Sequence, residues 1–241
     1  LQPGQKYIAK LTVVNTGTAT WTNNGYTPVT LGVSNNSFLC NSTWLSCNRP
    51  AYLQEASVAP GQTGHFKFYF WAPYTPGPYR EYFAPLAEFA AWMTGDSDSL
   101  GIAVKSPGTY DWQNLGYRVL DQTEAHYMDP GQLQASQKYI VKLAALNTGT
   151  ATWTNTGTMP VTLGTANSAG HNSFICYSSW LSCNRPAYLQ EASVAPGQIG
   201  NFKFMIQAPA TPGSYREYFT PLAEMFTWFK DSSESLGIQV H

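Results

Sequence analysis

Charged residues are scarce in this chain of 241 residues. Lys, Arg, Asp and Glu make up 11% of it, with 13 basic residues against 14 acidic ones, whereas an ordinary soluble domain is about one quarter charged. The near-neutral balance and the lack of a basic stripe leave no electrostatic footprint for nucleic acid, so none is expected as a partner. A polar but weakly charged surface is common outside cells and in self-associating assemblies.

Long apolar runs are also missing. No stretch of 18 or more apolar residues occurs, so we expect no membrane insertion. The first residues, LQPGQKY, carry neither a basic stretch nor an apolar core. We therefore expect any secretory signal to have been removed.

Cysteine is limited to four residues, which form two C-x6-C pairs, Cys40 with Cys47 and Cys176 with Cys183. Half of a zinc site is one alternative, but His171, near Cys176, has no counterpart beside the first pair. We therefore predict two short-loop disulfides, each contributing roughly 2.5 kcal/mol in the chain-entropy model. Disulfides persist in oxidising compartments, which predicts an extracellular or cell-surface location. We expect no metal and no cofactor.

The chain repeats itself. The nineteen residues WLSCNRPAYLQEASVAPGQ occupy 44–62 and again 180–198 without a change. Leu1–Val33 aligns with Leu133–Thr165 at an offset of 132, and after four extra residues in the second copy the offset is 136 to the end. A repeat of this length is a domain with its own core rather than a solenoid unit. The predicted domains are 1–105 and 106–241.

Within each copy, apolar residues alternate with polar ones. In HFKFYFWA (65–72), Phe66, Phe68 and Phe70 fall on one face and the residues between them on the other. KYIAKLTVV and YREYFAPLAE alternate in the same way, and turn-forming sequences such as NTGTAT and APGQT separate the runs. Many short strands with frequent turns are typical of a sandwich of ~7 strands. We therefore predict an all-β chain of two tandem antiparallel Ig-like β-sandwich domains.

The second copy opens with a segment that the first copy lacks. TYDWQNLGYRVLDQTEAHYMDPGQ (109–132) precedes Leu133, and no counterpart stands before Leu1. Its aromatic and β-branched residues predict an opening strand. We therefore expect the first domain to present an open sheet edge, completed by an upstream segment or by a neighbouring molecule.

An ordered set of motifs runs through both copies: NTGTATWTN, VTLG, RPAYLQE, VAPGQ and AP-x-TPG-x-YREYF. In this set each copy resembles the four-tryptophan Ig-like domain named after the autophagy receptor "next to BRCA one", in its bacterial form, over nearly all of its length. The resemblance implies a β-sandwich used as a binding or spacer module, found in bacterial relatives on secreted and cell-wall proteins, and it brings no catalytic residue. The matching tryptophans are Trp21, Trp44 and Trp92 in the first copy and Trp112, Trp153, Trp180 and Trp228 in the second.

Ten charged residues recur at matched positions. A pair of carboxylates can act as the acid and base of a glycosidase, but each glutamate has an arginine nearby, as Glu81 has Arg80, and no histidine has an equivalent in the other copy. We therefore predict structural ion pairs and no enzyme. The residues are Arg49, Glu55, Arg80, Glu81, Glu88, Arg185, Glu191, Arg216, Glu217 and Glu224.

The aromatic residues allow two interpretations. Trp71, Tyr74 and Trp92 could stack on sugar rings and form a ligand-facing surface, whereas tryptophans that recur in both copies are expected to pack in the core. Trp71 is matched by Gln207 in the second copy, so the fold does not depend on it.

Repetition favours a structural role, because a second copy adds length and multivalent attachment, whereas a catalyst needs one cleft. We therefore predict a non-enzymatic extracellular structural or adhesive protein, a tandem building block of a surface filament, stalk or array. Its expected partner is itself, joined head to tail through strand or edge complementation, or another surface protein. The alternative is a carbohydrate- or cell-wall-binding module pair of a larger secreted protein, with glycans as ligands.

Overall fold

The computed structural model divides the chain into two compact units, Leu1–Ser106 (domain 1) and Pro107–His241 (domain 2). The described residues are 1–93, 98–166, 170–229 and 234–241. The strands of domain 1 are β1 (Lys6–Val14), β2 (Trp21–Thr22), β3 (Val29–Gly32), β4 (Ala51–Tyr52), β5 (Ser57–Val58), β6 (Thr63–Trp71), β7 (Gly77–Ala87), β8 (Ala91–Trp92) and β9 (Asp98–Val104). The elements of domain 2 are β10 (Trp112–Leu120), the 3-10 turn η1 (Pro130–Gln132), β11 (Lys138–Asn147), β12 (Trp153–Thr154), β13 (Val161–Thr165), β14 (Ala187–Tyr188), β15 (Ser193–Val194), β16 (Ile199–Gln207), β17 (Gly213–Ala223), β18 (Thr227–Trp228) and β19 (Glu234–Val240).

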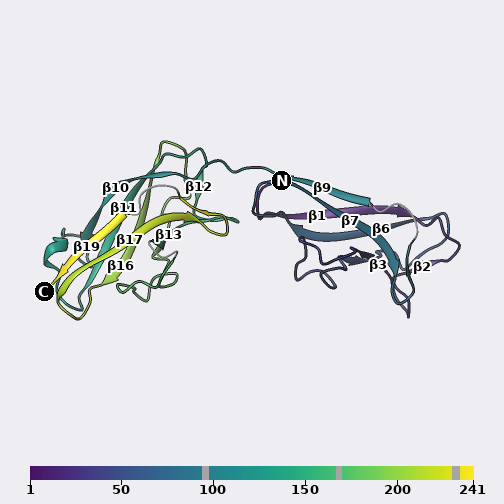
Figure 1. Cartoon of the computed structure of the whole chain (residues 1–241), viewed down its shortest axis with the longest axis horizontal. Coiled ribbons are helices and arrows are strands. Elements are labelled where there is room, and N and C mark those ends of the chain that lie inside the picture. The colour runs from purple at the N-terminus through teal and green to yellow at the C-terminus, as the bar shows by residue number, and fades with distance from the viewer. Residues whose placement is uncertain (94–97, 167–169, 230–233) are drawn as a thin grey trace. The chain divides into compact units, whose positions relative to one another are not determined.

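Domain 2 is a sandwich of antiparallel sheets (Figure 1). One sheet has the order β10-β11-β16, and the other has the order β14-β13-β17, with β18 and β19 also pairing with β17. The short strands β12 and β15 pair separately. The residues of β16 alternate between buried and more exposed, so this sheet buries one face against the core that both sheets share.

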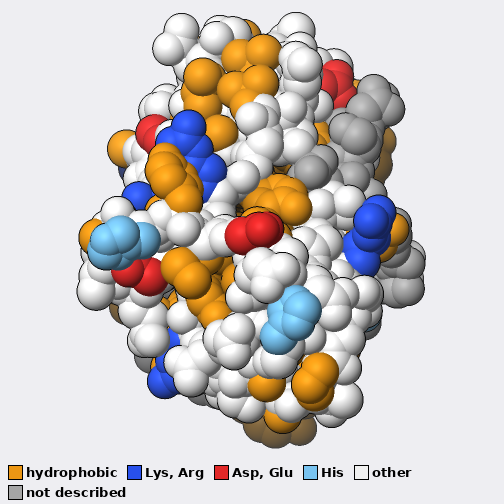
Figure 2. Space-filling model, turned by 90° about the vertical axis from the view of Figure 1, so that its left-hand side faces the viewer, with side chains coloured by type: hydrophobic (Ala, Val, Ile, Leu, Met, Phe, Trp, Pro, Cys, Tyr) orange, Lys and Arg blue, Asp and Glu red, His pale blue; other side chains and the backbone are white. Residues whose placement is uncertain are grey.

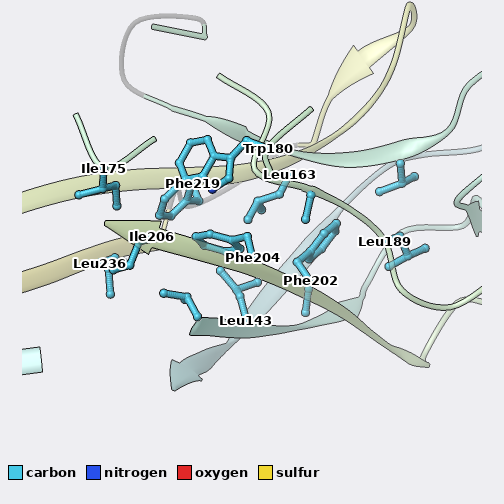
Figure 3. Packing of buried hydrophobic residues seen from close by; sticks show 14 of the residues in the cluster. Leu143, Leu163, Ile175, Trp180, Leu189, Phe202, Phe204, Ile206, Phe219 and Leu236 are labelled. Atoms are coloured by element: carbon cyan, nitrogen blue, oxygen red, sulfur yellow. The ribbon is translucent and has the colours of Figure 1, made fainter. Parts of the chain in front are cut away.

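Aromatic rings fill the centre of that core (Figure 3). The ring of Trp180 meets Phe204 edge to face, with the centroids 5.7 Å apart, and Phe204 packs on Phe219 at 5.2 Å. The indole N–H of Trp180 donates to the carbonyl oxygen of Met205 at 2.6 Å. This bond satisfies the one polar group that the ring carries into the core.

Domain 1 has the same layout, with one difference that bears on function. Its sheets have the orders β1-β6 and β4-β3-β7-β8, with β9 also on β7 and with β2 paired to β5. Phe66, Phe68 and Phe70 of β6 are 0%, 4% and 3% exposed, so the predicted alternation is confirmed. The chain is all-β and consists of two tandem antiparallel Ig-like β-sandwich domains. The difference is that the sheet of β1 and β6 contains no counterpart of β10 within the described residues.

The surface reflects the low charge of the sequence. On the face drawn in Figure 2, charged side chains lie scattered among uncharged ones. In the part of the chain that the structure describes, no helix is long and apolar enough to cross a membrane.

Candidate functional site

Two of the recurring charged residues form the same ion pair in both domains. In domain 1, Arg49 Nε donates to Glu88 Oε1 at 2.7 Å, and the Thr30 hydroxyl donates to the same oxygen at 2.6 Å. Burial of Glu88 opposes its ionisation, but the hydrogen bonds from Thr30 and Arg49 outweigh that effect and lower its pKa. The matching distances in domain 2 are 2.8 Å for Arg185–Glu224 and 2.5 Å for Thr162–Glu224. These residues tie β3 and the loop before β4 to the end of β7.

Within the described residues, Glu55 and Glu191 accept hydrogen bonds from β6 and β16 rather than from an arginine. Glu55 accepts the backbone N–H of His65 at 2.9 Å, and its other oxygen lies 2.6 Å from His65 Nδ1. Burial raises the pKa of Glu55, but the bonds from His65 outweigh it, and the net effect is a lowered pKa. Glu191 accepts the backbone N–H and the side-chain amide of Asn201 at 2.8 and 2.7 Å.

The expected pairing of Arg80 with Glu81 is replaced by other contacts. Successive side chains of a strand point to opposite faces, so neighbours on β7 do not face each other. Glu81 accepts from the Ser37 hydroxyl at 2.6 Å, and Arg80 lies 3.3 Å from the Ser99 hydroxyl. In domain 2, the buried Glu217 contacts His171 Nε2 at 2.9 Å. Arg216, in the position that matches Arg80, lies opposite Gly237 in the pairing of β17 with β19.

Both predicted disulfides are present. Cys40 is bonded to Cys47, and Cys176 is bonded to Cys183, with Cα–Cα distances of 4.8 and 5.1 Å. Each disulfide lies within the long loop that joins β3 to β4 or β13 to β14. The described part of the chain contains no free cysteine.

The three predicted ligand-facing aromatics do not form one surface. Trp71 ends β6 beside Lys6, whose ammonium lies 5.1 Å from its ring, and Tyr74 lies at that same end, against Gly4. Trp92 lies near Val14 at the other end of β1, eight residues from Lys6 along the ladder, which is about 26 Å at 3.3 Å per residue. Trp92 packs on Gly32 and stacks over Arg49 at 5.4 Å, as Trp228 stacks over Arg185 at 5.1 Å. A single sugar ring cannot contact all three residues.

The clearest candidate site is the outer edge of β1. In domain 2, the matching strand β11 lies between β16 and β10, and in domain 1 the described residues pair β1 with β6 only. Ile8 of β1 is 51% exposed, whereas Ile140, its equivalent on β11, is 6% exposed. The inward-facing residues of β1 are half-buried, whereas those of β11 are fully buried.

The backbone of β1 offers unpaired groups at this edge. The Gln5 carbonyl accepts from Ala72 and the Asn15 N–H donates to Gln62, both on the side of β6. Because the direction of backbone groups alternates along a strand, the N–H and C=O groups of Ile8, Lys10 and the other even-numbered residues of β1 point away from β6.

A groove continues this edge. It has a volume of about 900 Å³, and its lining includes Val14, Gly17, Trp21, Trp92 and Met93. Together with the outer edge of β1, we call it the acceptor groove.

In domain 2, the segment before β10 fills the matching place. Tyr110 packs on Phe229 and Phe226, with ring centroids 5.2 and 5.8 Å apart. Trp153, the counterpart of Trp21, is 0% exposed there, whereas Trp21 is only half-buried. The missing counterpart of 109–132 was a signal for the open edge, but no sequence pattern indicated the groove.

No family model matches the chain, and no curated protein matches it. Among solved structures, the C-terminal domain of the Streptococcus pyogenes antigen I/II-family protein AspA is similar over 77% of this chain, with 12% identity and a TM-score of 0.26. The chain spans 61% of the length of that domain. The C-terminal domain of the Streptococcus agalactiae AgI/II polypeptide BspA is similar over 100% of this chain and 94% of that chain, with 11% identity and a TM-score of 0.25. At such TM-scores we draw no conclusion from either likeness.

Proposed function

We propose that this chain is a non-enzymatic extracellular building block that works by contact. Its molecules join head to tail by strand or edge complementation at the outer edge of β1, and repetition of that joint builds a surface filament, stalk or adhesive array. The observation that carries the proposal is that β1 pairs only with β6 within the described residues, whereas β11 pairs with both β10 and β16.

An open, regular edge is a template for strand addition. The register of β1 against β6 runs without a shift from Lys6 to Val14, so the outer edge has no bulge to interrupt a partner strand. The outer strand of domain 2 is different, because β10 carries an irregularity between Asn114 and Tyr117, and such bulges protect natural sheet edges. A joint made by one end of a molecule with a different surface of the next does not close on itself, and it therefore permits a filament.

The remaining features support a structural role. The two disulfides fit an oxidising compartment outside the cell. The charged pairs that recur, Arg49–Glu88 and Arg185–Glu224, hold loops to strands within each domain, a use that requires no substrate.

We further propose that both domains belong to the four-tryptophan Ig-like group. The tryptophans have matched structural uses in the two copies, which supports this assignment. Trp44 donates its indole N–H to the Tyr69 carbonyl at 2.7 Å, as Trp180 does to Met205. Trp112, which is buried at the start of β10, belongs to the strand for which domain 1 has no described counterpart.

Sedimentation velocity and negative-stain electron microscopy of the intact chain test the proposed joint. We expect concentration-dependent, end-to-end particles. Ile8→Pro removes an outward N–H without touching the ladder to β6, and it should abolish assembly, since proline is tolerated at a free edge but blocks strand addition. Ile8→Thr keeps the N–H and should assemble like the natural chain. Monomers alone at high concentration, or assembly that survives Ile8→Pro, would overturn the proposal.

A further inference from the structure

We propose that the outer face of the sheet β4-β3-β7-β8, together with the same face of β14-β13-β17-β18 in domain 2, binds the neutral sugar units of a polysaccharide. Each site consists of an exposed tyrosine, a tryptophan that lies against the sheet, and an arginine–glutamate pair. The inference goes beyond the proposed function and does not depend on the outer edge of β1, because every feature that carries it is present in both domains.

The pairing register places the two aromatic residues on one face of the sheet. In domain 1, Tyr52 lies opposite Thr30, Thr30 lies opposite Leu86, and Leu86 lies opposite Trp92. Residues that are opposite each other on neighbouring strands have their side chains on the same face. Leu31, the neighbour of Thr30 on β3, belongs to the core, so the row from Tyr52 to Trp92 faces outward.

Domain 2 repeats this row in the same register, with Tyr188, Thr162, Leu222 and Trp228. Tyr52 and Tyr188 are both 48% exposed, and the two tryptophans are also partly open to solvent. Aromatic residues that are left exposed together, at the same place on two domains, are typical of an interaction surface.

The arginine and the tyrosine of each site belong to the nineteen residues that the two copies share unchanged, 44–62 and 180–198. The core is less uniform than this stretch, since the buried Phe70 corresponds to the buried Ile206. Packing alone does not require the same exposed tyrosine twice, whereas binding of the same ligand by both domains does.

A glycine lets the tryptophan lie against the sheet in each domain. A Cβ atom at Gly32 would be 2.6 Å from Cη2 of Trp92, and one at Gly164 would be 2.6 Å from the same atom of Trp228. The indole of Trp92 therefore reaches from β8 across β7 to β3, the strand next to that of Tyr52. A ring that is held in place before the ligand arrives loses little freedom on binding.

The ion pair leaves one donor and one acceptor for a ligand. Arg49 uses Nε for Glu88 and Nη1 for the Asn48 carbonyl, and both hydrogen bonds that Glu88 accepts go to Oε1. Within the described residues, Arg49 Nη2 and Glu88 Oε2 have no hydrogen-bond partner, and the two side chains are 19% and 21% exposed. The same two atoms are left over in Arg185 and Glu224.

These groups together identify the class of ligand. The aromatic rings offer an apolar surface with a negative face, against which the C–H groups of a sugar ring can pack. A charged ligand is attracted by one member of the ion pair and repelled by the other. A neutral hydroxyl, in contrast, can donate to the carboxylate and accept from the guanidinium. A neutral sugar unit meets both conditions.

Two sites in one chain favour a ligand with repeating units. A polysaccharide offers the same sugar many times, so that binding at one domain raises the effective concentration of sugar at the other. We therefore expect weak binding of a short oligosaccharide and tighter binding of the polymer.

Affinity electrophoresis of the intact chain tests the inference, in native gels that contain a soluble β-glucan, a galactomannan, soluble starch or the acidic polygalacturonate. We expect a neutral polymer to slow the chain and polygalacturonate to leave it unaffected. Tyr52→Ala combined with Tyr188→Ala should raise the dissociation constant for the neutral polymer roughly tenfold or more, since the aromatic residues of a contact carry most of its energy. Each single variant should raise it less.

The tyrosines are changed in this test because Trp92 and Trp228 also pack on their sheets, whereas loss of an exposed tyrosine should leave thermal unfolding nearly unchanged. Trp71→Gln is the matched control, since Trp71 lies at the end of β6 and domain 2 carries Gln207 in its place. This variant should bind like the natural chain. The inference is overturned if no neutral polymer slows the chain, if polygalacturonate alone does, or if the double tyrosine variant binds as well as Trp71→Gln.

The Ile8→Pro variant separates this inference from the proposed function, because Ile8 lies on the other sheet. This variant should bind the neutral polymer as the natural chain does. Assembly of a chain that binds no neutral polymer would leave the building-block role standing and remove the sugar sites. Polymer binding by a chain that stays monomeric would keep the sugar sites and remove the self-assembly.

Discussion

Ile8 and Ile140 occupy the same place on the first long strand of the two domains, yet Ile8 is 51% exposed and Ile140 is 6% exposed. In domain 2, Leu120 of β10 lies opposite Ile140, and the bridge from Glu124 to Lys142 and Lys203 lies on the same face of the sheet. In domain 2, the segment 109–132 therefore covers a face of the sheet that the described residues of domain 1 leave exposed.

The glycine pair gives a prediction on stability. Gly149→Ala should destabilise domain 2 by about 1–3 kcal/mol, the usual range for overpacking, because its Cβ would collide with the Thr109 carbonyl. Gly17→Ala should change the stability of domain 1 by less than about 0.5 kcal/mol, as surface substitutions do. Differential scanning calorimetry of both variants measures the contrast, and equal losses would contradict the account of the groove.

The hydrogen bonds of Glu88 predict that the stability of domain 1 falls at acid pH. The pKa of Glu88 is lower in the folded chain than its ordinary value of 4.5, so its stabilisation is complete above that value and is lost as the pH falls through the folded pKa. Glu88→Gln should cost about 1–3 kcal/mol at neutral pH, the range for hydrogen bonds to charged groups. The loss should shrink as the pH falls below 4.5. Urea unfolding at several pH values measures it, and a loss that does not vary with pH would argue against an ionised Glu88.

Reduction of the disulfides should lower the free energy of unfolding of each domain without unfolding it at room temperature. Each bond closes a loop with a sequence separation of 7, for which the chain-entropy model gives about 2.5 kcal/mol. Replacing Cys40 and Cys47 by serine should lower the unfolding temperature of domain 1 alone, and the pair Cys176 and Cys183 should do the same for domain 2. A shift in the unaltered domain would mean that the two units do not unfold independently.

The Glu124 bridge should hold its loop on the sheet of domain 2. The pKa of Glu124 is lowered, first by the hydrogen bond from Lys142 and then by that from Lys203, so the carboxylate is ionised at neutral pH. Glu124→Gln should speed hydrogen exchange over residues 121–128 and leave the core strand β13 unaffected. Lys138→Gln is a control, since the ammonium of Lys138 lies over the ring of Tyr177 and not beside Glu124. Unchanged exchange in Glu124→Gln would contradict the role of this bridge in holding the loop.

The alternation of β6 allowed its buried face to be predicted, because a two-residue period depends only on local sequence. The spacing of Cys40 and Cys47 likewise limited their pairing. The partner of Glu81 could not be predicted, because Ser37 is distant in sequence and the neighbour Arg80 lies on the other face of β7. The acceptor groove could not be predicted from local patterns either, because its walls come from segments that are far apart in the sequence.

Hydrogen exchange over residues 6–14, compared between assembled material and the dilute chain, tests the central claim most directly. We predict rapid exchange of the outward-facing amides of β1 in the dilute chain and strong protection of the same amides in the assembly. If β1 exchanges equally fast in both states while the protein is assembled, the joint lies elsewhere and strand addition to domain 1 is contradicted.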